Sequence, residues 1–150
     1  MKAQNTKQSL LAAMALTIAA SFNSNSQSLK TENETSKTMS YSHLEKLTIN
    51  NSTQWVLVRG KNIHAPLLIH VQAGPGLPMI SEANKMEKQL HLENDFLVAY
   101  WDQRGCGLSY NKNISSKSIN LAQMTDDVIA CTKYLLEKYD KDKALLVGYS

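Results

Sequence analysis

The stretch ALLVGYS, residues 144–150, is the part of the sequence that decides the fold. Its apolar run is typical of a strand buried within a sheet, and it leads directly into Gly148-Tyr149-Ser150. Gly-x-Ser is the first half of the strand–turn–helix motif Gly-x-Ser-x-Gly, whose glycines permit a tight turn around the serine. Because Gly-x-Ser is common by chance, its meaning depends on what precedes it.

Two further apolar runs precede this stretch. LLIHV, residues 67–71, ends at Ala73-Gly74-Pro75-Gly76, and FLVAYW, residues 96–101, ends at DQRG, residues 102–105. Such near-continuous apolar runs predict strands that are buried on both faces. Weaker alternation over residues 44–49 and 55–58, on either side of a turn-forming Asn50-Asn51-Ser52, predicts a hairpin.

Two segments have apolar residues at helical spacing. They predict helices over residues 81–91 and residues 121–138, the second with Asn120 as its N-cap and Gln123 at the capping-box position. The expected order is therefore strand, strand, strand, helix, strand, helix, strand. A hairpin followed by alternating strands and helices predicts a mostly parallel α/β sheet.

The N-terminus is typical of a secretory signal. Lys2 and Lys7 precede the largely apolar residues 9–22, which as a helix would extend only about 21 Å, less than the ~30 Å hydrocarbon core of a bilayer. We therefore expect a signal peptide at 1–26, a flexible polar linker at 27–40, a folded part at 41–150, and export to the periplasm or the medium. The alternative is an amphipathic or disordered leader on a cytoplasmic protein.

Charge and cysteine content exclude several classes of protein. The net charge is only +3, which gives no case for binding nucleic acid or an anionic membrane surface. Cys106, in a Gly-flanked loop, and Cys131, on the apolar face of the second helix, are the only cysteines. We expect neither a disulfide between them nor a nucleophilic thiol, and two isolated cysteines make no metal site. We expect no cofactor.

Three loops now follow three buried strands, at the sheet edge where ligands of α/β proteins bind. The segments QAGPG (72–76), WDQRGCGLS (101–109) and LVGYS (146–150) resemble the α/β-hydrolase fold and, within it, the proline iminopeptidase-like serine hydrolases. The resemblance covers residues 42–150. It implies the N-terminal part of a domain that usually has about 250 residues or more, truncated at the nucleophile elbow.

The resemblance implies roles for three residues. Ser150 is the expected nucleophile, and Gly74 is the expected donor of a backbone N–H to the oxyanion hole, with Ala73 as second choice. In this fold the chain order is serine, acid, histidine, so both partners of Ser150 are expected beyond residue 150. The histidines all precede Ser150, and we expect them to be structural or on the surface; they are His43, His64, His70 and His91.

Alternative interpretations remain for these motifs. Ser150 is otherwise an ordinary serine after a strand, and Gly74 part of a simple turn. Asp102 and Arg104 could be a catalytic pair, but we favour a structural pair that fixes its own loop. Gly105-Cys106-Gly107 lacks the third glycine of a dinucleotide-binding loop.

The expected function is hydrolysis of a small amide, a peptide N-terminus or an ester through a serine acyl-enzyme. Dehalogenases and epoxide hydrolases of the same fold carry Asp in place of the serine. The expected partner is a small-molecule or short-peptide substrate, with no nucleic acid and no stable membrane anchor. The alternative is an inactive fragment or a non-catalytic remnant of such a hydrolase.

Overall fold

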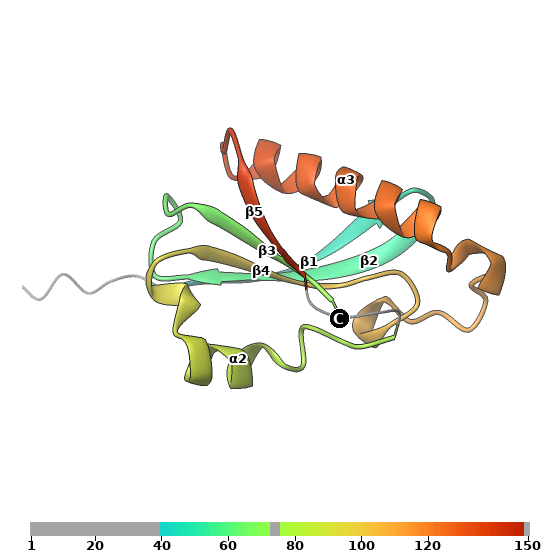
Figure 1. Cartoon of the computed structure of the whole chain (residues 1–150), viewed down its shortest axis with the longest axis horizontal. Helices are drawn as coiled ribbons and strands as arrows, with labels where there is room; N and C mark the ends of the chain where they lie inside the picture. The colour runs from blue at the N-terminus through green and yellow to red at the C-terminus, as the bar shows by residue number, and fades with distance from the viewer. Residues whose placement is uncertain (1–39, 73–75, 149–150) are drawn as a thin grey trace, which may run out of the picture. The chain divides into compact units, whose positions relative to one another are not determined.

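The computed structural model describes residues 40–72 and 76–148. They form one five-stranded sheet in the order β1-β2-β4-β3-β5 (Figure 1). The strands are β1 (Tyr41–Ile49), β2 (Ser52–Gly60), β3 (Leu67–Val71), β4 (Leu97–Asp102) and β5 (Ala144–Gly148). β1, β2 and β4 pair antiparallel, whereas β4, β3 and β5 pair parallel. The predicted hairpin and the parallel part of the sheet are thus confirmed.

Helices cover both faces of this sheet. Figure 1 shows α3 (Leu121–Lys138) on one face and α2 (Ala83–Leu90) on the other. Three short 3-10 helices lie in the connections: η1 (Leu92–Asn94), η2 (Gly107–Ser109) and η3 (Ser116–Ser118). Among the described residues, no helix has the length and apolar character needed to span a membrane.

The hairpin turn explains why β1 and β2 pair along their whole length. Asn50 and Asn51 both have positive φ, 46° and 60°, as the two central residues of a type I′ turn require. Ile49 therefore lies directly opposite Ser52, and the register continues to Tyr41 opposite Gly60. Both strands are longer than predicted, because pairing extends into stretches with little apolar alternation.

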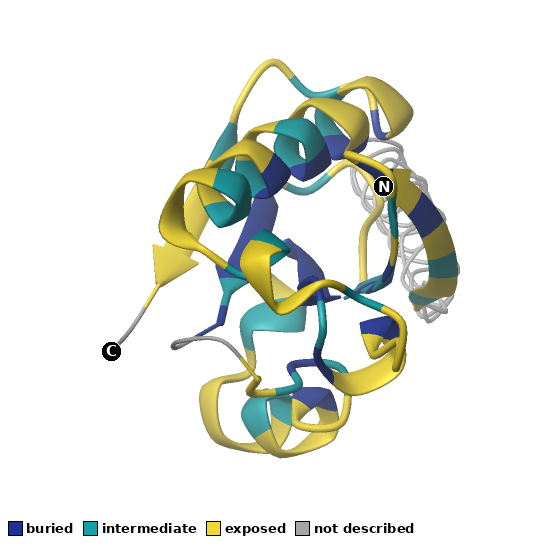
Figure 2. Ribbon diagram, turned by 90° about the vertical axis from the view of Figure 1, so that its right-hand side faces the viewer, coloured by how far each residue is buried: buried dark blue, intermediate teal, exposed yellow. Residues whose placement is uncertain are grey.

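β4 divides the core into two parts. Leu97, Ala99 and Trp101 pack on the α3 side, and Val98 and Tyr100 pack on the α2 side. All six residues of β4 are buried, which confirms the prediction from its continuous apolar run. The buried residues of α3 lie on the side that faces the sheet (Figure 2).

The start of α3 was predicted correctly, with one difference. The Asn120 side chain accepts a hydrogen bond from the Gln123 backbone N–H at 3.0 Å, as an N-cap should. The Gln123 side chain does not return to Asn120; it donates to Asp127 Oδ1 at 3.0 Å. Only one of the two hydrogen bonds of a capping box is therefore formed, because the Gln123 side chain binds the buried Asp127 carboxylate one turn further along α3.

β5 pairs with β3 on one side and lies at the end of the sheet. Although its sequence is apolar throughout, Leu145 and Leu146 are each 51% exposed and Val147 is 39% exposed.

The α2 helix is shorter than the predicted 81–91. It ends at Leu90, and the next residue, His91, caps the helix in a left-handed conformation (φ 51°).

Candidate active site

The carboxyl ends of β3, β4 and β5 lie at one edge of the sheet, because these strands are parallel. This is the edge at which α/β proteins bind ligands. Ser150 follows the end of β5 by two residues in the sequence. Ser150, Gly74 and Ala73 all lie outside the described residues, as do the predicted signal peptide and nearly all of the predicted linker. The described part of the site is therefore the loop after β4 and its surroundings.

Asp102 holds two segments together at this edge. Its carboxylate is buried; Oδ1 accepts the backbone N–H groups of Met79 (2.6 Å) and Ile80 (3.0 Å), and Oδ2 accepts that of Leu108 (2.8 Å). Gly107 has to be glycine here, because a Cβ on it would lie 2.0 Å from Oδ2 of Asp102 and its φ is +46°. Asp102 thus fixes the loop after β4 against the segment that leads into α2.

Arg104 does not pair with Asp102, which corrects the expected Asp102–Arg104 pair. Its guanidinium instead makes a bidentate pair with Asp127 of α3, with Nε–Oδ2 at 2.8 Å and Nη2–Oδ1 at 2.9 Å. Arg104 is 6% exposed and Asp127 is 1% exposed. The preference for a structural role over a catalytic one is supported, but the partner, Asp127 of α3, was not predicted.

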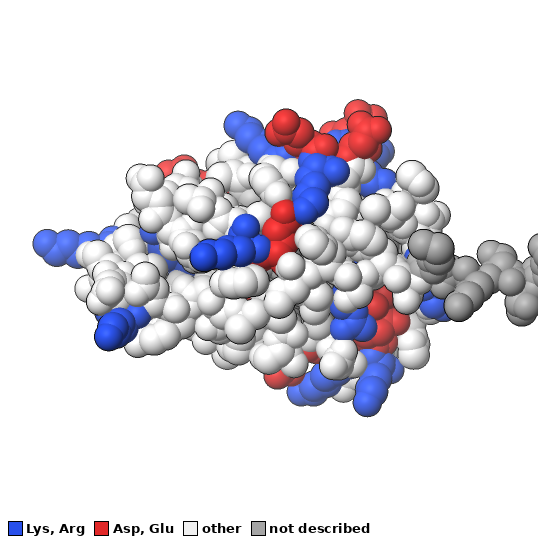
Figure 3. Space-filling model, turned by 180° about the vertical axis from the view of Figure 1, so that it is seen from behind, with Lys and Arg blue, Asp and Glu red and all other residues white. Residues whose placement is uncertain are grey.

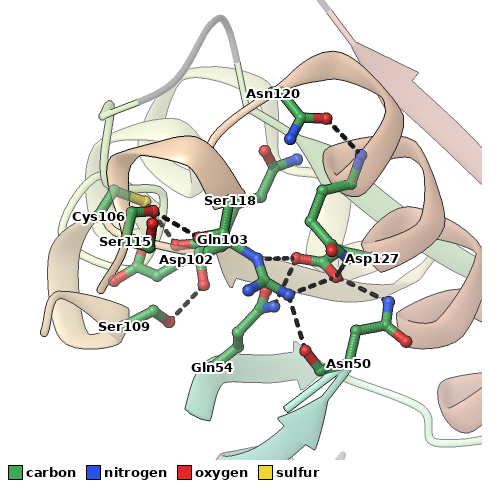
Figure 4. Close-up of polar contacts among 12 residues, drawn as sticks. Asn50, Gln54, Asp102, Gln103, Cys106, Ser109, Ser115, Ser118, Asn120 and Asp127 are labelled. Carbon is green, nitrogen blue, oxygen red and sulfur yellow. Dashed lines mark hydrogen bonds and ion pairs between the residues drawn. The ribbon is translucent and has the colours of Figure 1, made fainter. Parts of the chain in front are cut away.

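The Asp127 carboxylate is the centre of a network that joins four segments (Figure 4). Besides Arg104, it accepts hydrogen bonds from Asn50 in the hairpin turn (2.8 Å), Gln54 in β2 (2.8 Å) and Gln123 one turn earlier in α3. Burial by itself would raise the pKa of Asp127, but these hydrogen bonds, led by those from Arg104, hold the pKa below its ordinary value. The carboxylate therefore stays charged and locks α3 to the loop after β4.

The position of Asp127 was the one sequence signal for this network. It lies beside Val128 on the stripe that also carries Cys131, so its side chain points toward the core. A charged residue on the buried face of a helix has to find a partner. The sequence did not indicate which partner, because Asn50 and Gln54 lie 77 and 73 residues away.

Ser109 and Cys106 complete the loop. The Ser109 hydroxyl donates to the carbonyl of Asp102 at 2.5 Å and accepts the backbone N–H of Trp55 in β2 at 2.8 Å. The Cys106 thiol lies 3.0 Å from Gln72 Oε1. Burial, together with the negative charge of Asp102, raises the pKa of Cys106 to about 11. Cys106 and Cys131 are both buried, with free thiols.

A cavity of about 460 Å³ opens beside this loop. It lies between the end of β3 and the first turns of α3, and none of its lining residues is charged: Val71, Gln72, Gln103, Ile119, Asn120, Leu121, Met124, Thr125 and Val128. Gln103 is 3% exposed, and its Oε1 atom has no hydrogen-bond partner. The lining is thus uncharged and mixes apolar residues with polar ones, among which the buried Gln103 Oε1 is unsatisfied.

No histidine of the described residues lies at this edge. His70 is buried within β3, where its ring stacks on Tyr100 with centroids 5.5 Å apart, and burial lowers its pKa. His43, His64 and His91 are exposed. Over residues 40–72 and 76–148, no group of three or more His, Cys, Asp or Glu side chains could hold a metal ion.

Known proteins resemble this chain in sequence and in structure. It is 38% identical over 107 residues to the probable aminopeptidase YbaC of Bacillus subtilis, covering 71% of this chain and 33% of that protein. A proline iminopeptidase-related protein of Thermus thermophilus superimposes on 73% of this chain and 36% of its own, with a TM-score of 0.58 and 19% identity. The chain forms the N-terminal part of an α/β-hydrolase fold.

Another α/β-hydrolase, the 2-hydroxy-6-oxo-6-phenylhexa-2,4-dienoate hydrolase of a Rhodococcus strain, gives a TM-score of 0.54 at 19% identity, over 74% of this chain and 38% of its own. No protein-family model matches the chain. This α/β-hydrolase chain spans about a third of the length of these relatives. The similarities support a hydrolase function in general.

Proposed function

We propose that the protein is a serine hydrolase that cleaves a small amide, a peptide N-terminus or an ester, with Ser150 as nucleophile. The observation that carries this proposal is the arrangement of β3, β4 and β5, whose carboxyl ends share one edge immediately before Ser150 in the sequence. The 38% identity to a probable aminopeptidase supports an N-terminal peptide bond as the first substrate to test.

The chemistry follows from the residues expected at this edge. The Ser150 hydroxyl attacks the substrate carbonyl carbon and passes its proton to a histidine, which a carboxylate orients; both are expected beyond residue 150. The backbone N–H of Gly74, or of Ala73 as second choice, stabilises the oxyanion. The histidine returns the proton to the leaving amine or alcohol, and water then hydrolyses the acyl-enzyme on Ser150.

The described residues support this proposal by fixing the surroundings of the edge. Asp102 anchors the backbone at Met79 and Ile80, a few residues after Gly74, and the Arg104–Asp127 pair anchors the loop after β4.

Figure 3 shows basic and acidic side chains interspersed over one face rather than gathered in a patch of one sign. An uncharged or weakly charged small substrate fits this distribution better than a polyanion.

The test uses the protein as its gene encodes it, with aminoacyl-naphthylamide and p-nitrophenyl ester substrates and a fluorophosphonate probe. We expect turnover of one of these substrates and labelling by the probe. Ser150→Ala should abolish both, whereas Ser116→Ala, at an exposed serine, should leave both unchanged; this outcome would support the proposal. No turnover of either substrate class together with no labelling would rule it out.

A second candidate is an inactive fragment or non-catalytic remnant of such a hydrolase. The exposed apolar strand β5 favours it, because an unpaired apolar edge promotes aggregation. It predicts that the isolated 150-residue chain is poorly soluble and inactive. A cooperative melt of monomeric residues 27–150, with measurable esterase turnover, would contradict it.

We also propose export after cleavage of a signal peptide at residues 1–26. Mass determination of the mature N-terminus after expression in a secreting host tests this. An intact N-terminus on protein found only in the cytoplasm would contradict it.

A further inference from the structure

His70 is a titratable side chain in the core on the α2 side of the sheet. It follows Leu68 by two residues in β3, so by alternation both side chains lie on the face that packs with α2. His70 is 2% exposed, and neither Nδ1 nor Nε2 has a hydrogen-bond partner in the part of the chain that the structure describes. A neutral imidazole has one N–H donor and one acceptor, and leaving both unpaired in a core is unfavourable. Packing alone therefore does not account for a histidine at this position.

The His70 ring packs flat against Tyr100, the residue opposite it in β4. The planes of the two rings are inclined by only 9°, and their centroids are 5.5 Å apart. Tyr100 is fully buried, and its hydroxyl donates to Glu93 Oε1 at 3.1 Å rather than to His70. In β5, on the other side of β3, the residue opposite His70 is Val147. The ring therefore has an aromatic and an apolar neighbour across the strands.

No charged group among the described residues offsets a proton on this ring. The titratable and charged side chains on this side of the sheet bond to other groups, and they are Arg59 of β2, Glu87 of α2, Glu93 of η1, Tyr100 and Asp102 of β4, and Cys106 of the loop after β4. Lys85 and Lys88 of α2 are exposed. Burial alone lowers the pKa of His70. The folded protein thus keeps the ring neutral at a pH at which the ring of an unfolded chain, with a pKa of about 6.5, already carries a proton.

The neutral ring makes the stability of this layer depend on pH. Because the pKa of His70 is lower in the folded protein than in the unfolded chain, its contribution to stability is complete above about pH 6.5. It declines as the pH falls from there toward the folded pKa. A proton that reaches the buried ring creates a charge without an acceptor, so the ring has to become exposed to water. The layer that covers the ring then has to open.

Helix α2 is less firmly attached to the sheet than α3. Ala83 is the one buried residue of α2, whereas α3 buries Cys131, Leu135 and the ion-paired Asp127. Local opening of a weakly packed segment takes less free energy than unfolding of the whole sheet. α2 is therefore the element that should move when His70 becomes charged.

We propose that His70 is a pH switch: its uncharged ring keeps α2 packed on the sheet near neutral pH, and its protonation in mild acid releases α2 while α3 stays in place. The segment that leads into α2 is also the one that Asp102 holds at the candidate active-site edge, through the backbone N–H groups of Met79 and Ile80. The switch would thus connect the pH of the surroundings to that edge.

A titration of the histidine rings by NMR tests the first step without any variant. The 150-residue chain is labelled in its histidines, and the ring signals are followed between about pH 8 and about pH 5. His43, His64 and His91 are exposed and serve as references in the same spectra. We expect His70 to take up its proton at a lower pH than every reference ring. Protonation of His70 together with the references, or at a higher pH, would overturn the proposal.

Hydrogen exchange tests the second step, by comparing amide protection in α2 and α3 at about pH 7.5 and about pH 5.5. The test variant is His70→Phe, which keeps a ring against Tyr100 and cannot take up a proton. The matched control is His64→Phe, the same change at an exposed histidine. In the unchanged chain and in the control, protection of α2 should fall in acid by up to about tenfold relative to His70→Phe, while that of α3 changes by less than about twofold.

The comparison with His70→Phe also removes the effect of Glu93. Burial raises the pKa of Glu93, so its contribution to stability grows in acid, in the opposite direction to that of His70, and Glu93 is present in every variant. The proposal is overturned if α2 has the same pH dependence in the unchanged chain and in His70→Phe, or if α3 loses as much protection as α2. Because both readouts concern the folded chain, the absence of hydrolysis would contradict the proposed function and leave this inference standing.

Discussion

Strands β4 and β5 have similar sequences and opposite environments. Both are short apolar strands of the parallel part of the sheet, and both end at the candidate active-site edge. β4 lies between β2 and β3 and all of its residues are buried. Within residues 40–72 and 76–148, β5 has β3 as its one neighbour, and most of its residues are exposed. The sequence of a strand therefore indicates the environment it is suited to, and its neighbours decide how much of that environment is present.

The largest expected effect comes from the network that fixes the end of β4. Asp127→Ala leaves the Arg104 guanidinium buried without its partner and should cost roughly 3–5 kcal/mol of unfolding free energy. The loop after β4 would then lack its link to α3, so the end of β4 would be held less tightly, as β5 is. Urea unfolding at low protein concentration, followed by circular dichroism, measures the loss.

Asp126→Ala is the matched control for this change. Asp126 is the preceding residue of the same helix and is exposed, so its loss should change the free energy by no more than about 0.5 kcal/mol. Equal effects at residues 126 and 127 would show that the network does not stabilise the fold.

Shortening one leucine in each strand tests the comparison directly. Leu97→Ala in β4, where the side chain is fully buried, should cost about 2–5 kcal/mol. Leu145→Ala in β5, where the side chain is half exposed, should cost less than about 1 kcal/mol in the chain alone. The same unfolding curves give both values, and a large cost at Leu145 would mean that β5 is already covered.

Glycine substitutions test how tightly the loop after β4 is packed. Gly107→Ala should cost about 2–3 kcal/mol, because the new methyl group meets the Asp102 carboxylate in a backbone conformation that alanine rarely adopts. Gly76→Ala has a similar conformational strain (φ +99°) but meets no atom within 4 Å, so it should cost about 1 kcal/mol. Thermal unfolding of the two variants compares them, and equal costs would argue against the close contact with Asp102.

The smallest expected effect is a dependence on pH. The folded pKa of Asp127 lies below its unfolded value, so its contribution to stability is complete above about pH 4 and declines as the pH falls through the folded pKa. The difference in unfolding free energy between the unchanged protein and Asp127→Asn should therefore shrink in acid. Urea titrations between neutral pH and strong acid measure it, with Asp126→Asn as control. A difference that stayed constant with pH would mean that the charge of Asp127 does not contribute.

The sequence predicted those features that depend on neighbouring residues. The Asn50-Asn51 turn, the Asn120 cap and the buried strands β3 and β4 each follow from a few adjacent side chains. The partner of Arg104 did not follow, because the contacts of Asp127 join segments that only the finished fold brings together. The apolar sequence of β5 taken alone predicts a buried strand, and its exposure depends on which strand lies beside it. The roles of Ser150 and Gly74 remain predictions.

The Asp127 network also sets an order of events during synthesis. The hairpin turn at Asn50 emerges from the ribosome well before residue 127, so this turn lacks its hydrogen bond to the carboxylate for the time needed to add 77 residues. The hairpin can form early from its own turn geometry and can pair with β4 through β2, but its turn is linked to α3 only when α3 has been made. A pause in translation before α3 would therefore leave β1, β2 and β4 exposed on the face that α3 later covers.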